Sequence, residues 1–588
     1  MAPDKDLGRV KNLLERELPL DLSPSVMREM SRQLTVAYAD GLKNSTASMI
    51  PSHIYHLPSG TEQGYFLSAD LGGSTLRVAL VHLLGGKDVS RRNRERAKPM
   101  DIVEIKSWSG IHIDNLKTLT GDEFFDWIAT RIGEVVIEKF GTKDTPILPL
   151  GLSWSFPIEN TSIYSGKIQD MGKGFRVAEG LIGTDLRTHF KNAFTRQGLK
   201  ISLEAIINDS LAALLSHAYV APATRCALIL GTGTNVAVSL PLSMFPDSKI
   251  HSNKPTSAKE VLTNTEFSMY GKEIYPVTKW DDALDAAMPR PGFQPLEYLI
   301  GGGYLGEIAR RLILDLRDDG LFGKTPASWD KPYGLSTEVL AAMEELRDDK
   351  PPKNYKNINS ALSELPDMPL SARDAKILKQ VALHISSRAA KYCGITLHAM
   401  IKFREQGDES PSSSLTKNIV PIAFVGSVME KYPTLFQRTQ NILDIMTGWT
   451  INSPDSQQRI VLEFAPESAI FGAAVSVAAA LEKKLGSLTS PLFAAPTSLP
   501  FTERSSNAST LLQQSSGQEE ESKSLESMAT PKKGPTESPM QEEPPFDALD
   551  ALDGNNNDSQ KPPFWHRVRA FFHNVFRKVF SKKRETQV

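Results

Sequence analysis

Cysteine is scarce in this sequence, and so are long apolar runs and any surplus of one charge. Only two cysteines, Cys226 and Cys393, occur among 588 residues, which excludes a disulfide framework and fits a reducing compartment. No run of about 18 apolar residues is present, so no segment is expected to span a bilayer. The net charge of −2 excludes a global attraction to nucleic acid or membrane, and we expect the body to bind no nucleic acid.

The rest of the composition is ordinary for a soluble protein. Hydrophobic residues make up 40% of the chain and charged residues 23%, and a chain of this length is expected to form two or more domains. The N-terminal residues lack the charged-then-apolar pattern of a secretory signal, so we expect an intracellular, cytosolic protein.

Two glycine turns rich in hydroxyl groups stand far apart in the chain. Each follows an apolar run that is typical of a strand, at 64–69 and at 226–230, and the first run belongs to a predicted hairpin over 64–83. Such turns let backbone N–H groups approach phosphate closely, so two of them predict a grip on one nucleotide from opposite sides. The turns read Gly72-Gly73-Ser74 and Gly231-Thr232-Gly233-Thr234.

A polar pair, Asn208-Asp209, lies between the two turns and follows the strand-like run 205–207. One interpretation is a cap for a helix predicted over 210–218, because both residue types favour the start of a helix. The other is a functional pair, since a carboxylate placed there can accept a proton from an oxygen nucleophile.

Further segments extend the pattern along the chain. They include Ser155-Phe156-Pro157, Asn264-Thr265-Glu266, Gly303-Tyr304-Leu305-Gly306-Glu307 and Gly472-Ala473-Ala474. In this order the motifs resemble the hexokinase family of the actin-like ATPase superfamily, over roughly residues 10 to 485. The resemblance implies an α/β fold, the two-lobed actin-like ATPase (ribonuclease H-like) hexokinase fold, whose lobes close over a cleft. It assigns 1–68 and 207–471 to the large lobe, and 69–206 and 472–485 to the small lobe.

The resemblance also implies a hexose site. A hexose is neutral and covered in hydroxyls, so its recognition takes carboxylates and amides in fixed geometry. Glu297 has a plainer interpretation as well, as a first-turn acid beside a helix predicted over 298–314. The implied sugar-binding residues are Ser155, Phe156, Asn208, Asn235, Glu266 and Glu297.

For the nucleotide, the resemblance implies ATP with Mg²⁺. Asp209 is the implied catalytic base, Lys173 the lysine near the transferred phosphate, and Asp70 the residue that holds the Mg²⁺ shell through water. Arg77 either helps to neutralise phosphate or makes a structural ion pair. The implied nucleotide-binding residues are Asp70, Gly72, Gly73, Ser74, Arg77, Gly231, Thr232, Gly233, Thr234, Gly426 and Ser427.

Several family motifs are altered. The family's Trp-Thr-Lys-Gly-Phe is here Met171-Gly172-Lys173-Gly174-Phe175, which removes a threonine hydrogen bond to sugar worth on the order of 0.5–1.5 kcal/mol. Its Asp-Gly-Ser becomes Val425-Gly426-Ser427, and its Gly-Ser-Gly-x-Gly-Ala-Ala loop becomes 468–474, without two of the glycines. We expect the side chains of Ser468, Ile470 and Phe471 to fill space beside the nucleotide and to oppose tight ATP binding.

These changes leave three functional hypotheses. The favoured one is a mainly regulatory, glucose-sensing hexokinase-like protein with weak or lost catalysis, because the sugar carboxylates and the base are kept while the nucleotide wall is altered. The first alternative is a fully active hexokinase of glycolysis, which transfers the γ-phosphate of ATP to the sugar 6-hydroxyl. The second is a scaffold targeted by its C-terminal tail.

The composition shifts after residue 485. Residues 486–563 are rich in Ser, Pro, Gln and Glu, and we expect a disordered linker there. Residues 564–588 place apolar side chains on one helical face and Lys and Arg on the other, which predicts a basic amphipathic helix. Such a helix suits a membrane surface or a protein partner; the other interpretations are packing on the body and a nuclear import signal.

Overall fold

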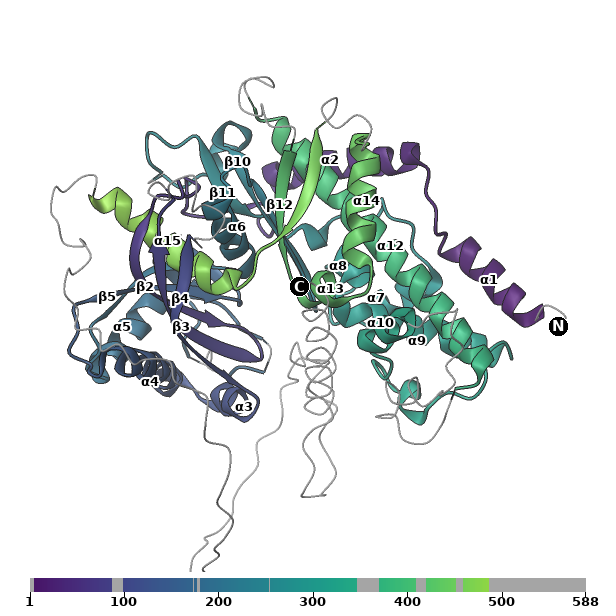
Figure 1. Ribbon diagram of the computed structural model, residues 1–588, viewed down its shortest axis with the longest axis horizontal. Helices are drawn as coiled ribbons and strands as arrows, with labels where there is room; N and C mark the ends of the chain where they lie inside the picture. Colours follow the sequence, from purple (N-terminus) through teal and green to yellow (C-terminus); the bar gives the residue numbers. More distant parts are fainter. Residues whose placement is uncertain are drawn as a thin grey trace, which may run out of the picture. The chain divides into compact units, whose positions relative to one another are not determined.

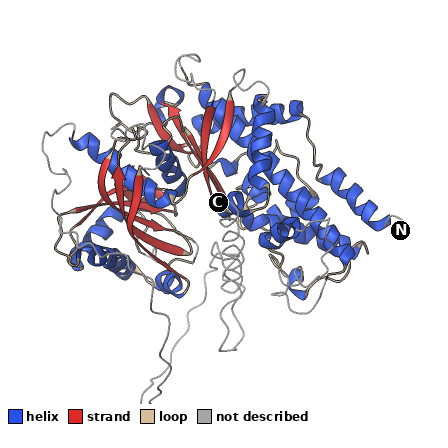
Figure 2. Cartoon of the chain, in the orientation of Figure 1, coloured by secondary structure: helices blue, strands red, loops and turns tan. Residues whose placement is uncertain are grey.

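The computed structural model describes residues 5–86, 99–172, 174–176, 180–252, 254–345, 370–408, 419–450 and 458–485. Lys173, the predicted linker 486–563 and the predicted helix 564–588 lie outside the described residues. The fold is mixed α/β (Figures 1 and 2).

Two mixed sheets form the frame, and the strand-like runs and the hairpin predicted from the sequence are among their strands. The larger sheet has the order β1-β11-β10-β9-β12-β13 and the smaller one β4-β3-β2-β5-β8, while β6 and β7 pair as a separate ribbon. The larger sheet is built from β1 (Ile50–Pro51), β9 (Cys226–Leu230), β10 (Thr234–Pro241), β11 (Glu260–Asn264), β12 (Ile419–Val425) and β13 (Arg459–Phe464). The remaining strands are β2 (Gln63–Leu71), β3 (Thr75–Leu84), β4 (Met100–Ser109), β5 (Leu148–Trp154), β6 (Ile158–Ser162), β7 (Ser165–Ile168) and β8 (Ile201–Ile207).

Helices cover the sheets, and among the described residues none has the length and apolar content that crossing a membrane takes. The first half of the chain holds α1 (Lys5–Glu17), α2 (Pro24–Asn44), α3 (Ile111–Thr118), α4 (Gly121–Phe140), α5 (Leu186–Arg196), α6 (Asp209–Val220) and α7 (Lys279–Ala286). The second half holds α8 (Pro295–Ile300), α9 (Gly302–Asp318), α10 (Thr337–Glu345), α12 (Ala372–Glu405), α13 (Ser427–Lys431), α14 (Leu435–Thr447) and α15 (Ser468–Leu485). Short 3₁₀ turns are η1 (Leu242–Met244), η2 (Asp247–Lys249), η3 (Phe267–Met269) and η4 (Ala327–Asp330).

Two helices, α6 and α15, share one hydrophobic core with both sheets (Figure 2). Ala212 and Val475 of these helices are fully buried beside Val81 of the smaller sheet and Ala423 of the larger one. The backbones come so close that a Cβ on Gly472 would lie 2.1 Å from the Ala212 carbonyl oxygen. The core therefore depends on small residues at this crossing, since a larger side chain would force the helices apart.

Each sheet also has its own core. The smaller sheet packs against α4 and α5, and the larger one against a helical layer that includes α2, α9 and the long α12. Cys226 on β9 and Cys393 on α12 are fully buried in the second of these cores. Burial raises the pKa of each thiol to about 12, because the thiolate would lose its hydration.

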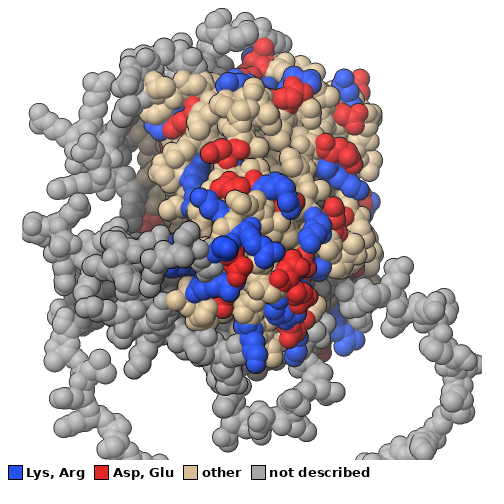
Figure 3. All heavy atoms as spheres, turned by 90° about the vertical axis from the view of Figure 1, so that its right-hand side faces the viewer, with Lys and Arg blue, Asp and Glu red and all other residues tan. Residues whose placement is uncertain are grey.

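The surface on the α1 side of the molecule carries both charge signs. Figure 3 shows acidic and basic side chains interspersed over this face, in line with the near-neutral net charge. Many are paired locally, such as Arg32 with Glu29 at 2.6 Å and Arg317 with Asp330 at 2.7 Å. Exposed pairs of this kind contribute little to stability.

A buried histidine joins α12 to α2. The Nδ1 atom of His398 lies 2.8 Å from Ser31 Oγ. Burial, together with the positive charges of Lys402 and Arg28, lowers the pKa of His398 to about 4. Because an unfolded histidine has a pKa of about 6.5, the unfolded chain binds the extra proton first as the pH falls.

We therefore predict that acid destabilises the fold through His398. Neutral His398 makes its full contribution to the free energy of unfolding above about pH 6.5. Between pH 7 and pH 5 the free energy of unfolding falls by roughly 2 kcal/mol for this reason. The variant His398→Gln keeps a polar partner for Ser31 and should lose that part of the pH dependence. Urea unfolding of both proteins at pH 7 and pH 5 measures the difference; equal pH dependence would contradict the assignment.

Candidate functional site

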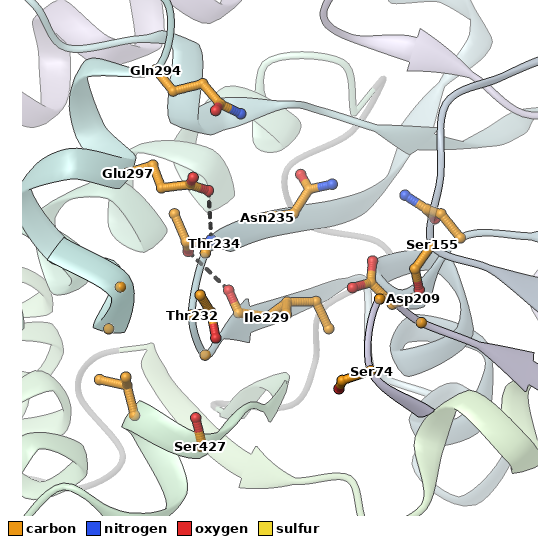
Figure 4. Close-up of a pocket in the computed structure, with 18 of the residues that line it drawn as sticks. Ser74, Ser155, Asp209, Ile229, Thr232, Thr234, Asn235, Gln294, Glu297 and Ser427 are labelled. Atoms are coloured by element: carbon orange, nitrogen blue, oxygen red, sulfur yellow. Dashed lines mark hydrogen bonds between the residues drawn. The ribbon is translucent and has the colours of Figure 1, made fainter. Parts of the chain in front are cut away.

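A cleft of about 3820 Å³ runs along the ends of strands from both sheets (Figure 4). It is several times larger than a pocket for one small ligand, so it has room for two substrates. Asp70, Arg77 and Gly426 are not among the residues that line it, and Lys173 is outside the described residues although Gly172 and Gly174 line it. The predicted residues that line it are Gly72, Gly73, Ser74, Ser155, Phe156, Asn208, Asp209, Gly231, Thr232, Gly233, Thr234, Asn235, Glu266, Glu297 and Ser427.

The turn between β9 and β10 is held by the backbone of α9. Gly302 N–H donates to the Gly231 carbonyl at 2.8 Å, and Gly303 N–H donates to the Thr232 carbonyl at 2.9 Å. The prediction of one continuous helix over 298–314 is wrong. The helix is interrupted at Gly301, between α8 and α9. The break lets the start of α9 meet the turn.

Glycine is required at this junction. A Cβ on Gly302 would lie 2.8 Å from the Gly231 carbonyl oxygen and 2.4 Å from a Val428 methyl, and one on Gly301 would lie 2.9 Å from the Thr232 carbonyl oxygen. Gly301 and Gly302 are therefore glycines for a steric reason rather than for flexibility.

Glu297 lies in the first turn of α8 and supports the same glycine turn. Its Oε2 atom accepts the Thr234 N–H at 2.9 Å, the bond drawn in Figure 4, and its Oε1 atom lies 3.3 Å from the Tyr304 hydroxyl. A Cβ on Gly233 would lie 2.6 Å from Glu297 Oε2, so this carboxylate fits closely against the turn.

A polar network follows the turn. The Asn235 amide donates to Asn264 Oδ1 at 2.8 Å and to Glu266 Oε1 at 3.4 Å, and the Asn264 amide donates to the same Glu266 oxygen at 2.8 Å. Burial raises the pKa of Glu266; the Asn264 hydrogen bond opposes this, and the charge of Asp209 adds to it. Two carboxylates, Asp209 and Glu266, thus face one space in the cleft.

The Asn208-Asp209 pair begins α6. Asn208 is the cap that its residue type predicts, since its Oδ1 accepts the Leu211 N–H at 3.0 Å. Asp209 is the first helical residue, and its Oδ1 accepts the Ser210 N–H at 2.7 Å. Figure 4 shows Asp209, Ser155, Asn235 and Glu297 around the same pocket, so capping and a place in the cleft go together.

The β2–β3 turn faces the cleft from the smaller sheet. It is closed by a hydrogen bond from Gly72 N–H to the Thr75 carbonyl at 3.0 Å. Arg77 makes the structural ion pair, with Asp70 at 2.7 Å and with Glu467 at 2.8 Å. Asp70 thereby has its carboxylate oriented by a cation just behind the turn.

The altered end of the cleft differs from the prediction. Ile470 is fully buried in the core shared by the two sheets, Phe471 packs on that core, and neither they nor Ser468 line the cleft. The expectation that these side chains fill it is wrong, because α15 begins at Ser468 and turns them inward. One contact at this end was not predicted from the sequence. The Oε1 atom of Glu430 accepts a hydrogen bond from the Gly426 N–H at 2.7 Å.

Two further lining residues were not predicted as site residues. Asn264 precedes Glu266 in a quoted motif and links it to Asn235. Gln294 directly precedes Pro295 at the start of α8, and its amide donates to Ser268 Oγ at 3.4 Å. The signal for Gln294 was its place one helical turn before Glu297.

The described residues contain no group of three or more His, Cys, Asp or Glu side chains that would hold a metal alone. Mg²⁺ is commonly bound by one or two carboxylates together with phosphate oxygens and water. Asp70 is a carboxylate beside the glycine turn, and it is paired with Arg77.

We predict that Gly302→Ala loosens the turn. The added methyl must displace the Gly231 carbonyl or Val428, so the free energy of unfolding should fall by roughly 1–3 kcal/mol. Gly8→Ala in α1 is the matched control, since its Cβ meets nothing within 4 Å and should stabilise the helix by up to about 1 kcal/mol. Urea unfolding compares the two; an unchanged Gly302→Ala protein would show that the junction tolerates a side chain.

Comparison with known proteins gives one consistent result. Two family models, both described as Hexokinase, match residues 12–219 and 225–479. Hexokinase-2 of Oryza sativa subsp. japonica is 31% identical over 485 residues, which cover 81% of this chain and 92% of the relative. The hexokinase of Schwanniomyces occidentalis is 29% identical, with 81% of this chain and 94% of the relative covered.

A solved structure agrees with the sequence matches. A Schistosoma mansoni hexokinase complexed with glucose resembles this fold with a TM-score of 0.63 at 25% identity, covering 81% of this chain and 99% of that one. The resemblance drawn from the motifs and the predicted fold class are confirmed. The chain belongs to the hexokinase family.

Proposed function

We propose that this protein binds a hexose, with glucose as the first candidate, and acts mainly as a glucose-sensing regulator with weak or lost phosphoryl transfer. The observation that carries the proposal is the contrast between the two ends of the cleft. The sugar-side carboxylates and amides form one linked network, whereas a carboxylate of the chain itself binds Gly426 N–H on the nucleotide side.

The sugar side has the donors and acceptors that a hexose needs. Asn235, Glu266 and Glu297 offer amide and carboxylate groups from the larger sheet and α8. Across the cleft, Ser155 offers a hydroxyl and Asn208 an amide. Phe156 is buried against Trp154 and Phe175, at ring distances of 5.1 and 4.9 Å, and makes this wall rigid. Polar groups fixed in this way reject a ligand that leaves them unpaired.

Residual catalysis would use Asp209 as the base for the sugar 6-hydroxyl. The two glycine turns would place backbone N–H groups on the phosphates, Lys173 would approach the transferred group, and Asp70 would hold the water shell of Mg²⁺. When bound, Mg²⁺ supplies charge neutralisation for the phosphates. Under this proposal, the alignment of sugar and nucleotide sets the rate, rather than a covalent intermediate with the protein.

The nucleotide side argues for weak turnover. Val425 replaces the family's aspartate at the end of β12. Glu430 and Glu338 both line the cleft, so an incoming polyphosphate meets carboxylates. Their repulsion of a polyanion is modest at exposed sites, about 1 kcal/mol or less for each pair.

A signalling role also needs an output. The predicted basic amphipathic helix at 564–588 belongs to this proposal as the output element, directed to a membrane surface or a protein partner. Closure of the cleft on sugar is the change that such an element would report.

The deciding experiment uses the full chain. Phosphorylation of glucose, fructose and mannose with Mg-ATP is followed in a coupled assay, beside thermal-shift titrations with glucose and with ATP. Stabilisation by glucose without turnover supports the sensor, because a ligand that binds only the folded state raises its stability. Turnover at rates usual for kinases, on the order of 1–100 s⁻¹, supports the active enzyme. Absence of any sugar effect and of turnover would overturn both.

We predict that Asp209→Asn abolishes any phosphorylation yet keeps the glucose-dependent thermal shift. The amide oxygen still accepts the Ser210 N–H but takes no proton, so turnover should fall by roughly 10²–10⁴-fold. Asp126→Asn is the matched control, because Asp126 pairs with Arg196 on the surface at 2.8 Å. Unchanged turnover in Asp209→Asn would remove Asp209 from the chemistry.

We predict that Glu430→Gln strengthens nucleotide binding. Removal of one charge beside Gly426 N–H should tighten MgADP by roughly two- to five-fold, the effect of an exposed charge pair. Glucose affinity should stay unchanged. Calorimetric titration measures the affinities for MgADP and for glucose. Glu29→Gln on α2 is the control, because the Glu29 carboxylate pairs with Arg32 and is far from Glu430 in the sequence. Equal MgADP affinity in all three proteins would count against a role for Glu430.

A further inference from the structure

A cation stacked on an aromatic ring lies on the rim of the cleft, beside the proposed sugar site. The guanidinium carbon of Arg290 lies 4.0 Å from the centroid of the Phe293 ring. Both residues line the cleft, and Arg290 is exposed while Phe293 is half-buried. The next residue, Gln294, lies near Glu297 in Figure 4. Arg290 and Phe293, which we call the rim platform, therefore continue the wall that carries the sugar-side groups.

The backbone holds the rim platform in place. The Gly292 N–H donates to Asp285 Oδ1 at 2.7 Å, and the Phe293 N–H donates to the Arg290 carbonyl at 3.2 Å. Gly292 has a φ of 76°, a conformation that favours glycine. A Cβ on Gly292 would lie 3.1 Å from Lys272 Nζ, so a second cation lies beside this loop. The platform is thus preorganised and has positive charge around it.

The charge of Arg290 reaches the sugar-side wall. Burial raises the pKa of Tyr298, the charges of Asp285 and Glu297 add to this effect, and the charge of Arg290 opposes it. Arg290 and Glu297 therefore both act on one hydroxyl group. Arg290 is exposed at the rim and Glu297 is half-buried, so an anionic group attached to a bound sugar would meet the cation at the rim.

The place of Asp209 decides which end of a hexose reaches the rim platform. Figure 4 shows Asp209 and Glu297 on opposite sides of the pocket, with Gln294 on the side of Glu297. A hexose whose 6-hydroxyl meets Asp209 turns the far side of its ring, with C1, C2 and C3, toward Glu297 and Gln294. Of these carbons, C1 carries the anomeric hydroxyl, a common position for a phosphate group on a hexose.

We propose that the rim platform binds the phosphate of a hexose 1-phosphate, whose sugar ring occupies the proposed hexose site. A guanidinium presents paired donors to phosphate oxygens, and stacking on Phe293 holds its plane in a fixed orientation. A phosphate on C6 would instead meet the carboxylate of Asp209 and be repelled. The inference rests on the proposed sugar site and goes beyond it by naming a ligand class, a hexose with an anionic group on C1.

The test measures binding to the full chain by calorimetry and needs no turnover. The probes are glucose, glucose 1-phosphate, glucose 6-phosphate and methyl glucoside, with both anomers of each C1 derivative. Methyl glucoside carries a neutral group on C1, so its comparison with glucose 1-phosphate separates the effect of charge from the effect of size. The ratio of these two dissociation constants is the phosphate preference.

Three variants test the residues. Arg290→Met removes the charge and keeps the length of the side chain, and Phe293→Leu removes the ring face and keeps an apolar side chain. Arg32→Met on α2 is the matched control, because Arg32 is exposed and does not line the cleft. Thermal unfolding of each variant checks that the fold is kept.

We expect the wild-type protein to bind glucose 1-phosphate about 3- to 10-fold more tightly than methyl glucoside, the effect of a charge-assisted contact at an exposed site. Arg290→Met should remove this preference, Phe293→Leu should reduce it, and Arg32→Met should keep it. The preference should also shrink when salt is raised from about 0.05 to about 0.5 M, because salt screens exposed charges.

Three results would overturn the inference while the proposed function stands. They are glucose binding without a phosphate preference in the wild-type protein, an equal preference in Arg290→Met, and glucose 6-phosphate bound as tightly as glucose 1-phosphate. If Arg290→Met weakens glucose and glucose 1-phosphate by the same factor, Arg290 has a structural role only, which also overturns the inference. Absence of binding by every sugar would instead refute the proposed function, and this inference with it.

Discussion

The hydrogen bonds between the β9–β10 turn and the start of α9 are the constraint on which the rest of the cleft depends. They fix the backbone at Gly231 and Thr232, and Glu297 bonds the same turn. The parallel pairing of β12 with β9 brings Gly426 beside Leu230 at the end of the neighbouring strand. A Cβ on Gly426 would lie 2.4 Å from the Leu230 carbonyl, so no side chain fits there. The shape of this part of the cleft is thus set by backbone packing.

The site follows a rule of open α/β sheets, in which ligands bind at the carboxyl ends of the strands. Turns or polar residues after β2, β5, β8 and β9 all meet at the cleft. The sheets supply positions, and the side chains at those positions supply the chemistry. Val425 ends β12, whereas the polar network around Glu266 follows β11, so these two ends of the cleft rest on different strands.

Local patterns in the sequence were enough to predict the strands at 64–69 and 226–230, the hairpin and the helix after Asp209, since each depends on its own apolar spacing. Most of the site residues named by the resemblance line the cleft. Features set by tertiary approach were not predictable from the sequence: the helix break at Gly301 and the inward turn of Ile470. Each depends on which segment distant in the chain lies opposite, and spacing along the chain carries no such information.

The two native thiols have a practical consequence for watching the cleft move. Cys226 and Cys393 are fully buried and their thiolates are strongly disfavoured, so maleimide and similar labels should pass them by. The wild-type chain is therefore a silent background for site-specific fluorophores or spin labels. A single cysteine placed on the exposed surface of each wall would report opening and closing directly, with no need to remove the natural residues first.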